Sequence, residues 1–409
     1  MRELVKLAVF DRSGPVKDRR LNDREFRIMA VAMTTIYADA FKRFLQATRE
    51  SDKLKRLRTD AFNRFTSVGF PAVKTEDWKY TNVAPIAGAE WQVDTGERQV
   101  PADIDIELLE RFNVGRNGFA ALNAAFGEIA TLRISKDTSV DEPIEFSFSA
   151  DEGSARFPHL LIIAEAGSKA TIVEKYASDS RSFTNSAVQI VVEDNANLTH
   201  YRVQKESPDA YHYGVTEVSV GRGGVYNSTN INLGAALSRH DIELKFTAEG
   251  GEAFVDGLYM LNGSQHSDTH SIIDHTVPNC TSHQTYKGVM NDKSRAVFNG
   301  KVFVRENAHG TDAQQSNKNL LLSNEARVDT KPQLEIFNDD VKCSHGATVG
   351  QLEEEELFYL LTRGLPENLA RNLLTYGFAE EIINKIEIES IKSDLDAAVL
   401  NRLNVSLAV

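Results

Sequence analysis

The hydrophobic pattern near the front of the chain is helical. Between about residues 34 and 67, large apolar side chains recur at steps of mostly three and four residues, which is typical of amphipathic helices. The pattern predicts one or two helices, which end where Gly69, Pro71 and Pro85 interrupt it. The side chains that carry the pattern are Ile36, Phe41, Phe44, Leu45, Leu54, Leu57, Phe62 and Phe65.

From about Leu160 to Val328 the pattern changes to short β-rich runs separated by Gly, Asn, Asp and Glu. Six twelve-residue windows within this stretch share one design, in which an apolar strand, a polar turn and a second strand follow one another. The last two windows fit the design more weakly than the first four. The windows start 27 or 28 residues apart, at Leu161, Gln189, Thr216, Leu244, Ile272 and Gly300.

A constant period of this size predicts a solenoid, because one repeat buries its apolar face only by stacking on the next. Strands that recur at the same place in each repeat favour a parallel β-helix. A β-sandwich is the alternative, although its strands do not require a long constant repeat. The pattern does not distinguish one coil per period from two shorter coils. Either solenoid would have exposed ends that need caps.

After Gly350 the pattern becomes helical again and predicts three or four short helices that cap the solenoid. Four glutamates, residues 353–356, suit a first helical turn, where the helix dipole favours negative charge. Gly364 and Gly377 are predicted helix ends, and Pro366 a first helical position. The chain is therefore predicted to divide into an N-terminal helical region (1–100), a β-helical core (101–345) and a C-terminal helical region (346–409).

Composition narrows the possible functions. The chain has 409 residues, 41% hydrophobic and 26% charged, which is ordinary for a soluble protein with a sizeable core. Its net charge of -13 disfavours nucleic-acid binding. No apolar run approaches the roughly 20 residues of a membrane span, and no export signal is evident at the start. These features predict a cytoplasmic protein without a membrane partner.

Common catalytic and cofactor motifs are absent from the sequence. Neither G-x-x-x-x-G-K-[ST] nor G-x-G-x-x-G occurs, which argues against nucleotide binding by this chain. G-x-S-x-G and H-E-x-x-H are also missing, which removes the simplest hydrolase interpretations. The two cysteines, Cys280 and Cys343, lie far apart in sequence and do not have the spacing of a structural zinc site. Cys280 lies within the repeat and is expected to be buried.

One stretch of the chain is rich in histidine. Strand alternation would place His266, Asp268 and His270 on one face, where they could present ligands to a metal. The simpler interpretation, which we favour, is a set of polar side chains on a solvated outer face. The full stretch contains His266, Asp268, His270, Asp274, His275 and His283.

The segment "VKCSHGATVG", residues 341–350, places Cys343 and His345 two positions apart, so both would point to the same side of a strand. Together they could bind a soft metal, or the imidazole could lower the pKa of the thiol and make it a nucleophile. One cysteine and one histidine fill at most half of a four-coordinate site. From these residues alone a structural role is the simpler interpretation.

Longer stretches resemble a known family. The run "LLLSNEARVDTKPQLEIFNDDVKCSHGATVGQL" with the following "LFYLLTRG", the upstream "AVFNGKVFV" and the early "EDWKYTN" closely resemble the SufB/SufD family of the Suf iron-sulfur cluster assembly system. The likeness extends from about Phe70 to the end of the chain. The chain lacks the cysteine-rich amino-terminal segment of the B-type members, which makes it more similar to the D-type members.

The resemblance implies a right-handed parallel β-helix flanked by N-terminal and C-terminal α-helical regions. It implies a heterodimer with a SufB-like paralogue through the β-helix, in which His345 is a metal ligand at the cluster-assembly interface. The other ligands would be a cysteine and a glutamate of the paralogue, and Cys343 occupies the neighbouring family position. It also implies a SufC-like ABC ATPase on the C-terminal helices, and the expected docking residues are Leu357, Phe358, Tyr359, Arg363, Gly364, Leu365 and Pro366.

The expected function is therefore that of a non-catalytic scaffold for iron-sulfur cluster assembly. The isolated chain is expected to bind no cofactor, whereas the complex would hold a cluster transiently and could also bind flavin. A homodimer is a possible state of the isolated chain. The alternatives are a β-helical carbohydrate-active enzyme, since that architecture also hosts lyases and hydrolases, and a free-standing metal-storage protein.

Overall fold

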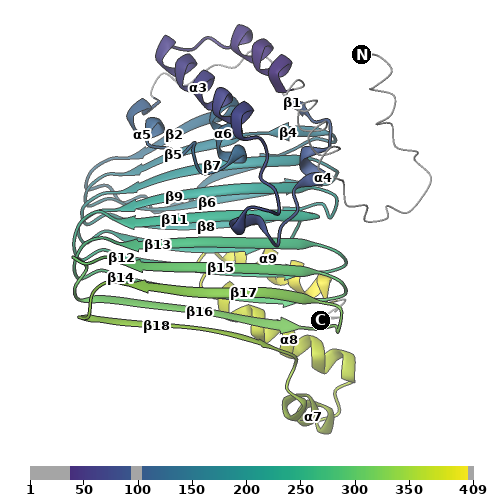
Figure 1. Ribbon diagram of the computed structural model, residues 1–409. Coiled ribbons are helices and arrows are strands. Elements are labelled where there is room, and N and C mark those ends of the chain that lie inside the picture. Colours follow the sequence, from purple (N-terminus) through teal and green to yellow (C-terminus); the bar gives the residue numbers. More distant parts are fainter. Residues whose placement is uncertain (1–36, 94–103, 404–409) are drawn as a thin grey trace, which may run out of the picture.

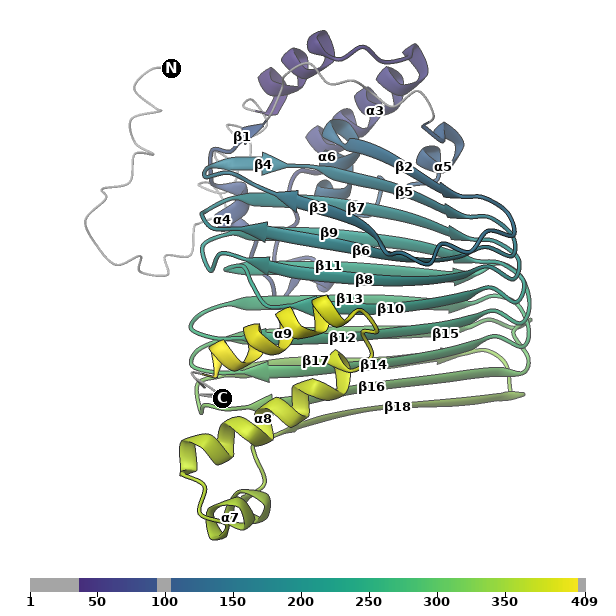
Figure 2. The same cartoon turned by 180° about the vertical axis from the view of Figure 1, so that it is seen from behind.

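The chain forms a parallel β-helix with helices packed at one end and along one side (Figures 1 and 2). The computed structural model describes residues 37–93 and 104–403. Residues 34–36, which belong to the first predicted helix, lie outside this part, as do the outermost residues of both predicted helical regions. No helix of the described part is long and apolar enough to cross a membrane.

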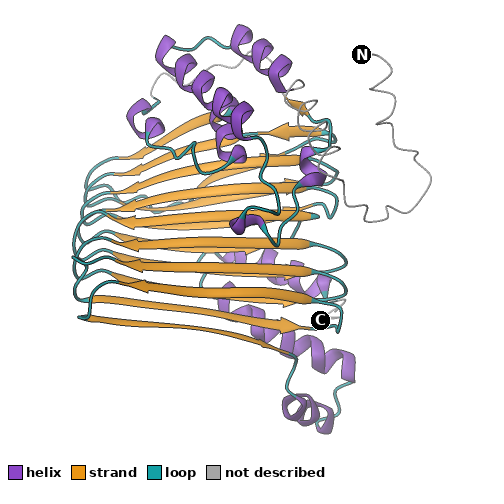
Figure 3. Cartoon of the chain, viewed as in Figure 1, coloured by secondary structure: helices purple, strands orange, loops and turns teal. Residues whose placement is uncertain are grey.

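Two parallel sheets face each other across the interior of the β-helix (Figure 3). Most of the chain from Glu128 to Gly350 alternates between them, one strand at a time. The first sheet contains β1 (Gln92–Val93), β2 (Glu128–Ile134), β4 (Ser154–Arg156), β5 (Pro158–Ala164), β7 (Phe183–Val192), β9 (Tyr211–Val220), β11 (Leu237–Phe246), β13 (His266–His275), β15 (Arg295–Val304) and β17 (Arg327–Ile336). The second sheet contains β3 (Ile144–Ser149), β6 (Lys169–Ser178), β8 (Asn197–Glu206), β10 (Val225–Asn232), β12 (Glu252–Leu261), β14 (Thr281–Met290), β16 (Thr311–Leu321) and β18 (Val341–Gly350).

The predicted solenoid is confirmed, and the β-sandwich alternative is wrong. Each twelve-residue window spans the end of a first-sheet strand, a turn and the start of the following second-sheet strand. One period is therefore one complete coil of two strands, which settles the question that the pattern left open. The two weaker windows form the same arrangement as the others, with β13 followed by β14 and β15 followed by β16.

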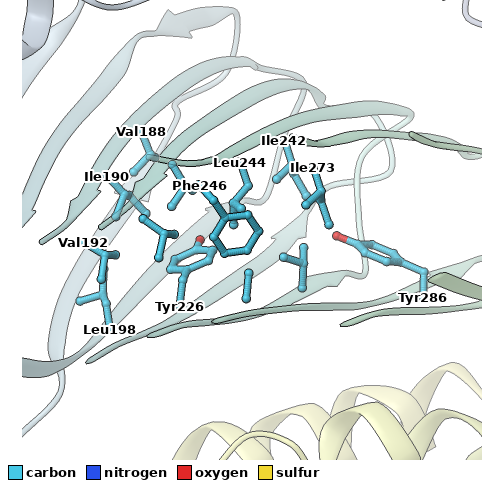
Figure 4. Packing of buried hydrophobic residues seen from close by; sticks show 14 of the residues in the cluster. Val188, Ile190, Val192, Leu198, Tyr226, Ile242, Leu244, Phe246, Ile273 and Tyr286 are labelled. Carbon is cyan, nitrogen blue, oxygen red and sulfur yellow. The ribbon is translucent and has the colours of Figure 1, made fainter. Parts of the chain in front are cut away.

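Register explains why the repeat is so regular. Neighbouring strands pair without a shift, so that Val188, Thr216 and Ile242 lie side by side on successive coils. Inward-facing apolar side chains therefore stack into columns that fill the interior (Figure 4). The turns contain residues with left-handed backbone, such as Asn195 (φ 57°) and Gly223 (φ 59°). Gly and Asn adopt the left-handed conformation more readily than other residues, which accounts for their presence in the predicted turns.

Glycines inside the coils leave space for large aromatic side chains, so a larger residue at such a position should lower stability. A Cβ added at Gly288 would lie 2.0 Å from the ring of Tyr259. That ring cannot easily move, because its hydroxyl donates to Asn319 and accepts from Asn317. We expect Gly288→Ala to lower the free energy of unfolding by about 1–3 kcal/mol, measured by urea denaturation. Gly350→Ala, where no atom lies within 4 Å of the added Cβ, is the control and should change it by less than about 0.5 kcal/mol. Equal stability of the two variants would contradict this packing.

The N-terminal helices cover the first end of the β-helix, as expected of a cap. Of the one or two helices that the pattern predicted, the structure has two, residues 37–47 and α3 (Asp52–Val68), and Gly69 (φ 64°) ends the second. The buried guanidinium of Arg58 donates to the carbonyls of Ala125 and Gly127 just before the first coil. The remaining helices of this region are η2 (Glu76–Trp78), α4 (Ala84–Ala87), α5 (Ile106–Glu110) and α6 (Gly118–Phe126).

The C-terminal helices are α7 (Glu354–Thr362), α8 (Glu367–Ile383) and α9 (Glu389–Arg402). They do not cap the other end, so that prediction is wrong. Figure 2 shows α8 and α9 along the outer face of the second sheet. Ile382, Ile383 and Leu395 pack there among side chains such as Leu258 and Val289. A sequence pattern predicts a helix but not the face on which it packs, and the outer face of this sheet is apolar enough to hold both helices.

Two details of these helices also differ from the sequence prediction. Helix α8 continues through Gly377 instead of ending there, because its second half is anchored against the sheet by residues such as Ala379. A glycine inside a helix costs only about 1 kcal/mol, which such burial readily offsets. Pro366 is the N-cap of α8 and not its first helical residue. The stop near Gly364 (φ 90°) is confirmed, since α7 ends at Thr362.

Candidate functional site

The last coil, formed by β17 and β18, is open. We call these two strands, residues 327–336 and 341–350, the open rung. Within the described residues β17 pairs only with β15, and β18 only with β16, so each strand leaves one edge unpaired. The inward side of the rung is also uncovered, with Val349 49% exposed. Unpaired backbone of this length is a template for pairing with another chain.

Cys343 and His345 lie on this rung and, as predicted, on the same side of the strand. Register places Cys343 beside Ala313 and His345 beside Gln315, and both of these neighbours face the buried interior. His345 thus continues an interior column that also contains Gln284. Because no coil follows β18, the side chain of His345 is exposed while that of Cys343 is half-buried.

The imidazole of His345 is held by the strand opposite. Its Nδ1 lies 3.0 Å from the carbonyl oxygen of Pro332 on β17. A carbonyl only accepts hydrogen bonds, so Nδ1 carries the proton and donates it. In the neutral ring the lone pair is then on Nε2. This is the arrangement by which proteins orient histidines that bind metals.

Cys343 has a different environment from its neighbour. Burial raises the pKa of its thiol, and the nearby carboxylate of Asp312 raises it slightly further, while a backbone contact with Ala313 opposes these effects. The thiol packs against the apolar interior. The described surroundings of Cys343 therefore disfavour its thiolate form, which is the nucleophilic one. Among the described residues there is no group of three or more His, Cys, Asp or Glu that could hold a metal ion.

A second exposed surface lies on α7 and the turn that follows it. Helix α7 buries none of its residues, and Phe358 and Tyr359 are 67% and 56% exposed. Figure 1 shows this helix protruding beyond the open rung. The guanidinium of Arg363 lies 5.0 Å from the centre of the Tyr359 ring. All seven expected docking residues lie in this segment, which we call the α7 surface.

Exposed apolar side chains are also present at the start of α8, outside the predicted set of docking residues. Leu369 and Leu373 are exposed one helical turn apart, and Leu361 is exposed on α7. The four-residue spacing of the first two was a visible signal that one face of α8 continues the same surface. The α7 surface is therefore larger than the predicted set of residues.

Helix α8 is attached to the second sheet by a buried lysine that sequence reasoning also missed. The side chain of Lys287 on β14 is only 4% exposed and forms an ion pair with Glu381. Its ammonium donates to the carbonyl of Phe378 at 3.0 Å. A second ion pair, at 2.8 Å, joins Lys385 to Asp256 on β12. The α7 surface is thus fixed through α8 to the same sheet that ends at His345.

The histidine-rich stretch does not form a continuous solvated outer face, so that interpretation is wrong, although His283 keeps 38% of its side chain exposed. Asp268 is buried because residues 76–83, which we call the strap, cross the outer face of the first sheet (Figure 1). Thr81 of the strap donates to Asp268 and lies 2.9 Å from Nε2 of His266. Asp268 also forms ion pairs with His270 and Arg239, although its Oδ1 is buried without a hydrogen-bond partner in the described part of the chain. Burial favours the neutral carboxyl, but the positive charge of Arg239 and the neighbouring histidines outweigh burial and hold the pKa of Asp268 far below its ordinary value.

Cys280 and His275 are part of the interior. Cys280 is buried in the main core, as predicted. His275 is also buried, next to the ring of Phe246, and its Nε2 lies 2.8 Å from the hydroxyl of Ser282. Burial lowers the pKa of His275 to about 4. Neither side chain is available to a ligand from outside.

Comparison with known proteins gives consistent matches over most of the chain. Residues 146–378 match the SufBD core domain of the SUF system of FeS cluster assembly, and residues 32–113 match the SufBD protein N-terminal region. A SufBD family iron-sulfur cluster assembly protein of Synechocystis sp. is 38% identical over 299 residues, which cover 70% of this chain and 66% of the relative.

Two further relatives are also named as iron-sulfur cluster assembly proteins. The iron-sulfur cluster assembly protein SufD of Escherichia coli is 37% identical over 252 residues, or 61% of this chain and 59% of the relative. A SufBD family protein of Mycobacterium leprae is 29% identical over 360 residues, or 82% of this chain and 91% of the relative. The chain covers less than two thirds of the length of the Synechocystis and Escherichia coli relatives.

Proposed function

The chain belongs to the SufBD family of iron-sulfur cluster assembly proteins, and we propose that it acts as a non-catalytic scaffold subunit of that machinery. In this role it pairs with a SufB-like paralogue and docks a SufC-like ABC ATPase. Its similarity to SufD of Escherichia coli supports the D-type assignment. The observation that carries the proposal is the open rung, which exposes His345 between two unpaired strand edges.

The open rung is the proposed contact with the paralogue. Both sheets end at the same coil, so a second β-helix with a similar open end can continue both sheets at once. Backbone hydrogen bonds along β17 and β18 would supply affinity, and the uncovered inward side chains would supply an apolar centre. In the isolated chain a second copy could occupy the same edges, which supports a homodimer as the resting state.

His345 is the proposed ligand for the nascent cluster, which is the cargo of the complex. Its Nε2 lone pair is available because Nδ1 is engaged by Pro332. A thiolate and a glutamate from the paralogue would complete the site, because the two carboxylates of the rung, Asp329 and Glu335, lie on the outward side of β17, away from His345 and Cys343. Cys343 would then line the wall of the site. We expect the isolated chain to bind no cofactor. Flavin binding by the complex, the domain boundaries and the cytoplasmic location also stay predictions.

The α7 surface is the proposed ATPase contact. Phe358 and Tyr359 are exposed aromatic side chains, and Arg363 lies over the ring of Tyr359. Aromatic residues and arginine are typical of the centre of an interface. Nucleotide binding and hydrolysis by the ATPase would move α7 and α8. The ion pairs of Lys287 and Lys385 would transmit that movement to the second sheet and so to the open rung.

Co-purification tests the proposal. The full chain is expressed with a SufB-like paralogue and a SufC-like ATPase, and the intact complex is weighed by native mass spectrometry. We expect one assembly that contains all three chains. A chain that remains alone under these conditions would contradict the scaffold role. Release of oligosaccharide by the isolated chain would instead support the carbohydrate-active alternative, and iron bound by the isolated chain would support metal storage.

A further inference from the structure

A polar cavity lies on the outer face of the first sheet, away from the open rung's inward side and from the C-terminal helices. It has a volume of about 370 Å³ and lies between the strap and strands β11, β13, β15 and β17. Trp78 and Tyr80 of the strap form one wall, and Arg116 closes the side nearest α6. We call it the strap cavity. Its volume is within the range of small-molecule sites.

Strand register arranges the floor of the cavity in two rows. One row is formed by Asp241, His270, Asn299 and Lys331, which lie side by side on β11, β13, β15 and β17. The parallel row is formed by Glu243, Ile272, Lys301 and Gln333. Neighbouring strands are about 4.8 Å apart. In both rows the side-chain charge changes from negative to positive across the floor, with carboxylates on β11 and ammonium groups on β15 or β17.

Several of these charges are already satisfied within the protein. Arg239 forms ion pairs with both Asp241 and Asp268 and so offsets their charge, although Oδ1 of Asp268 keeps no hydrogen-bond partner among the described residues. Glu243 pairs with Arg116 but keeps 33% of its side chain exposed to the cavity. Lys301 makes a longer ion pair, at 3.4 Å, with Glu335.

Other groups in the cavity can still form an ion pair or a hydrogen bond with a ligand. Lys331 forms no ion pair within 4 Å in the described part of the chain, and its side chain is exposed; the opposite charge that acts on it is that of Glu76 in the strap, which is itself paired with Lys79. The Oδ1 of Asn299 is buried without a hydrogen-bond partner, and it lies between the acidic and basic ends. A buried acceptor that lacks a partner is costly unless water or a ligand donates to it.

We propose that the strap cavity binds a zwitterionic small molecule of the amino-acid or dipeptide class. The ligand carboxylate would lie toward Lys301 and Lys331, and its ammonium would donate toward Glu243 and Oδ1 of Asn299. Ile272 and Val297 in the floor offer apolar contact to the rest of the molecule. A simple anion would leave the acidic end of the cavity without a partner. A simple cation would leave the lysines without a partner. Only a molecule with both charges complements the two ends together.

Isothermal titration calorimetry on the full chain tests this site. The probes are the twenty standard L-amino acids and the dipeptide Gly-Gly, each titrated separately, with sodium acetate and methylammonium chloride as single-charge references. We expect at least one zwitterion to bind at least about tenfold more tightly than either reference. Binding of Gly-Gly without any free amino acid would assign the site to a peptide, and the reverse would assign it to a free amino acid.

Two variants connect binding to the cavity. Lys331→Gln removes an exposed charge and should weaken binding of the zwitterion about tenfold while leaving the thermal unfolding temperature unchanged. Lys293→Gln, at an exposed lysine outside the cavity, is the matched control and should bind as the parent chain does. The proposal is overturned if no zwitterion binds, if either reference binds equally well, or if Lys331→Gln binds unchanged.

Discussion

Replacing His345 with alanine is expected to reduce cluster formation in the reconstituted complex by on the order of 10- to 100-fold, as loss of groups that hold a metal typically does. The imidazole is exposed, and it donates a hydrogen bond to the carbonyl of Pro332. Its removal should therefore change the free energy of unfolding by less than about 1 kcal/mol. Pairing with the paralogue should also persist, because the strand edges that we propose for it are backbone.

Cluster formation is followed by the visible absorbance of the assembled cluster, and pairing by size-exclusion chromatography with light scattering. His345→Gln adds a useful comparison, since its carboxamide can still donate a hydrogen bond to Pro332 but lacks an imidazole lone pair. His309→Ala, at an exposed histidine in the turn between β15 and β16, is the control. A normal cluster yield from both His345 variants would contradict the ligand role.

The second large effect is expected at the α7 surface. Replacing Phe358 with glutamate should weaken ATPase binding by about 100-fold, because loss of a central aromatic contact costs at least about 2 kcal/mol and the new carboxylate must also be desolvated. Helix α7 buries none of its own residues, so the β-helix should unfold at the same temperature as before. Surface plasmon resonance with immobilised ATPase measures the change in affinity.

A point substitution is a sharper test here than removal of the C-terminal helices. Deleting α8 and α9 would expose Leu258, Met260 and Val289 on the second sheet, so lost binding could simply reflect a damaged fold. Ser393→Glu adds the same charge to an exposed position on α9 and should leave ATPase affinity unchanged. Full affinity of the Phe358→Glu variant would show that the ATPase binds elsewhere.

Local pattern was sufficient to predict the core of the fold. The strand–turn–strand windows predicted the coils because parallel pairing without a register shift repeats the same inward positions in every coil. The same two-residue alternation placed Cys343 and His345 on one side of β18. Left-handed turn residues such as Asn195 explain the composition of the turns. In each case the information lies within a few residues of the position that it determines.

Contacts between distant segments could not be predicted in this way. Thr81 of the strap binds Asp268, which buries a stretch that reads as a solvated face. In the sequence, Lys287 cannot be distinguished from an exposed lysine, because α8, the helix that buries it, is distant along the chain. The position of α8 and α9 along the side of the sheet, instead of over the end, also depends on which apolar faces remain uncovered. This last difference matters most for the proposed function, because α8 and α9 do not cover the open rung.

Hydrogen exchange measured by mass spectrometry, with and without a SufB-like paralogue, tests the central claim most directly. The account predicts that amides in residues 327–336 and 341–350 exchange at least about tenfold more slowly in the complex, while those of β5 and β7 at the covered end do not change. A stable complex in which the amides of β17 and β18 exchange as fast as in the free chain would contradict it.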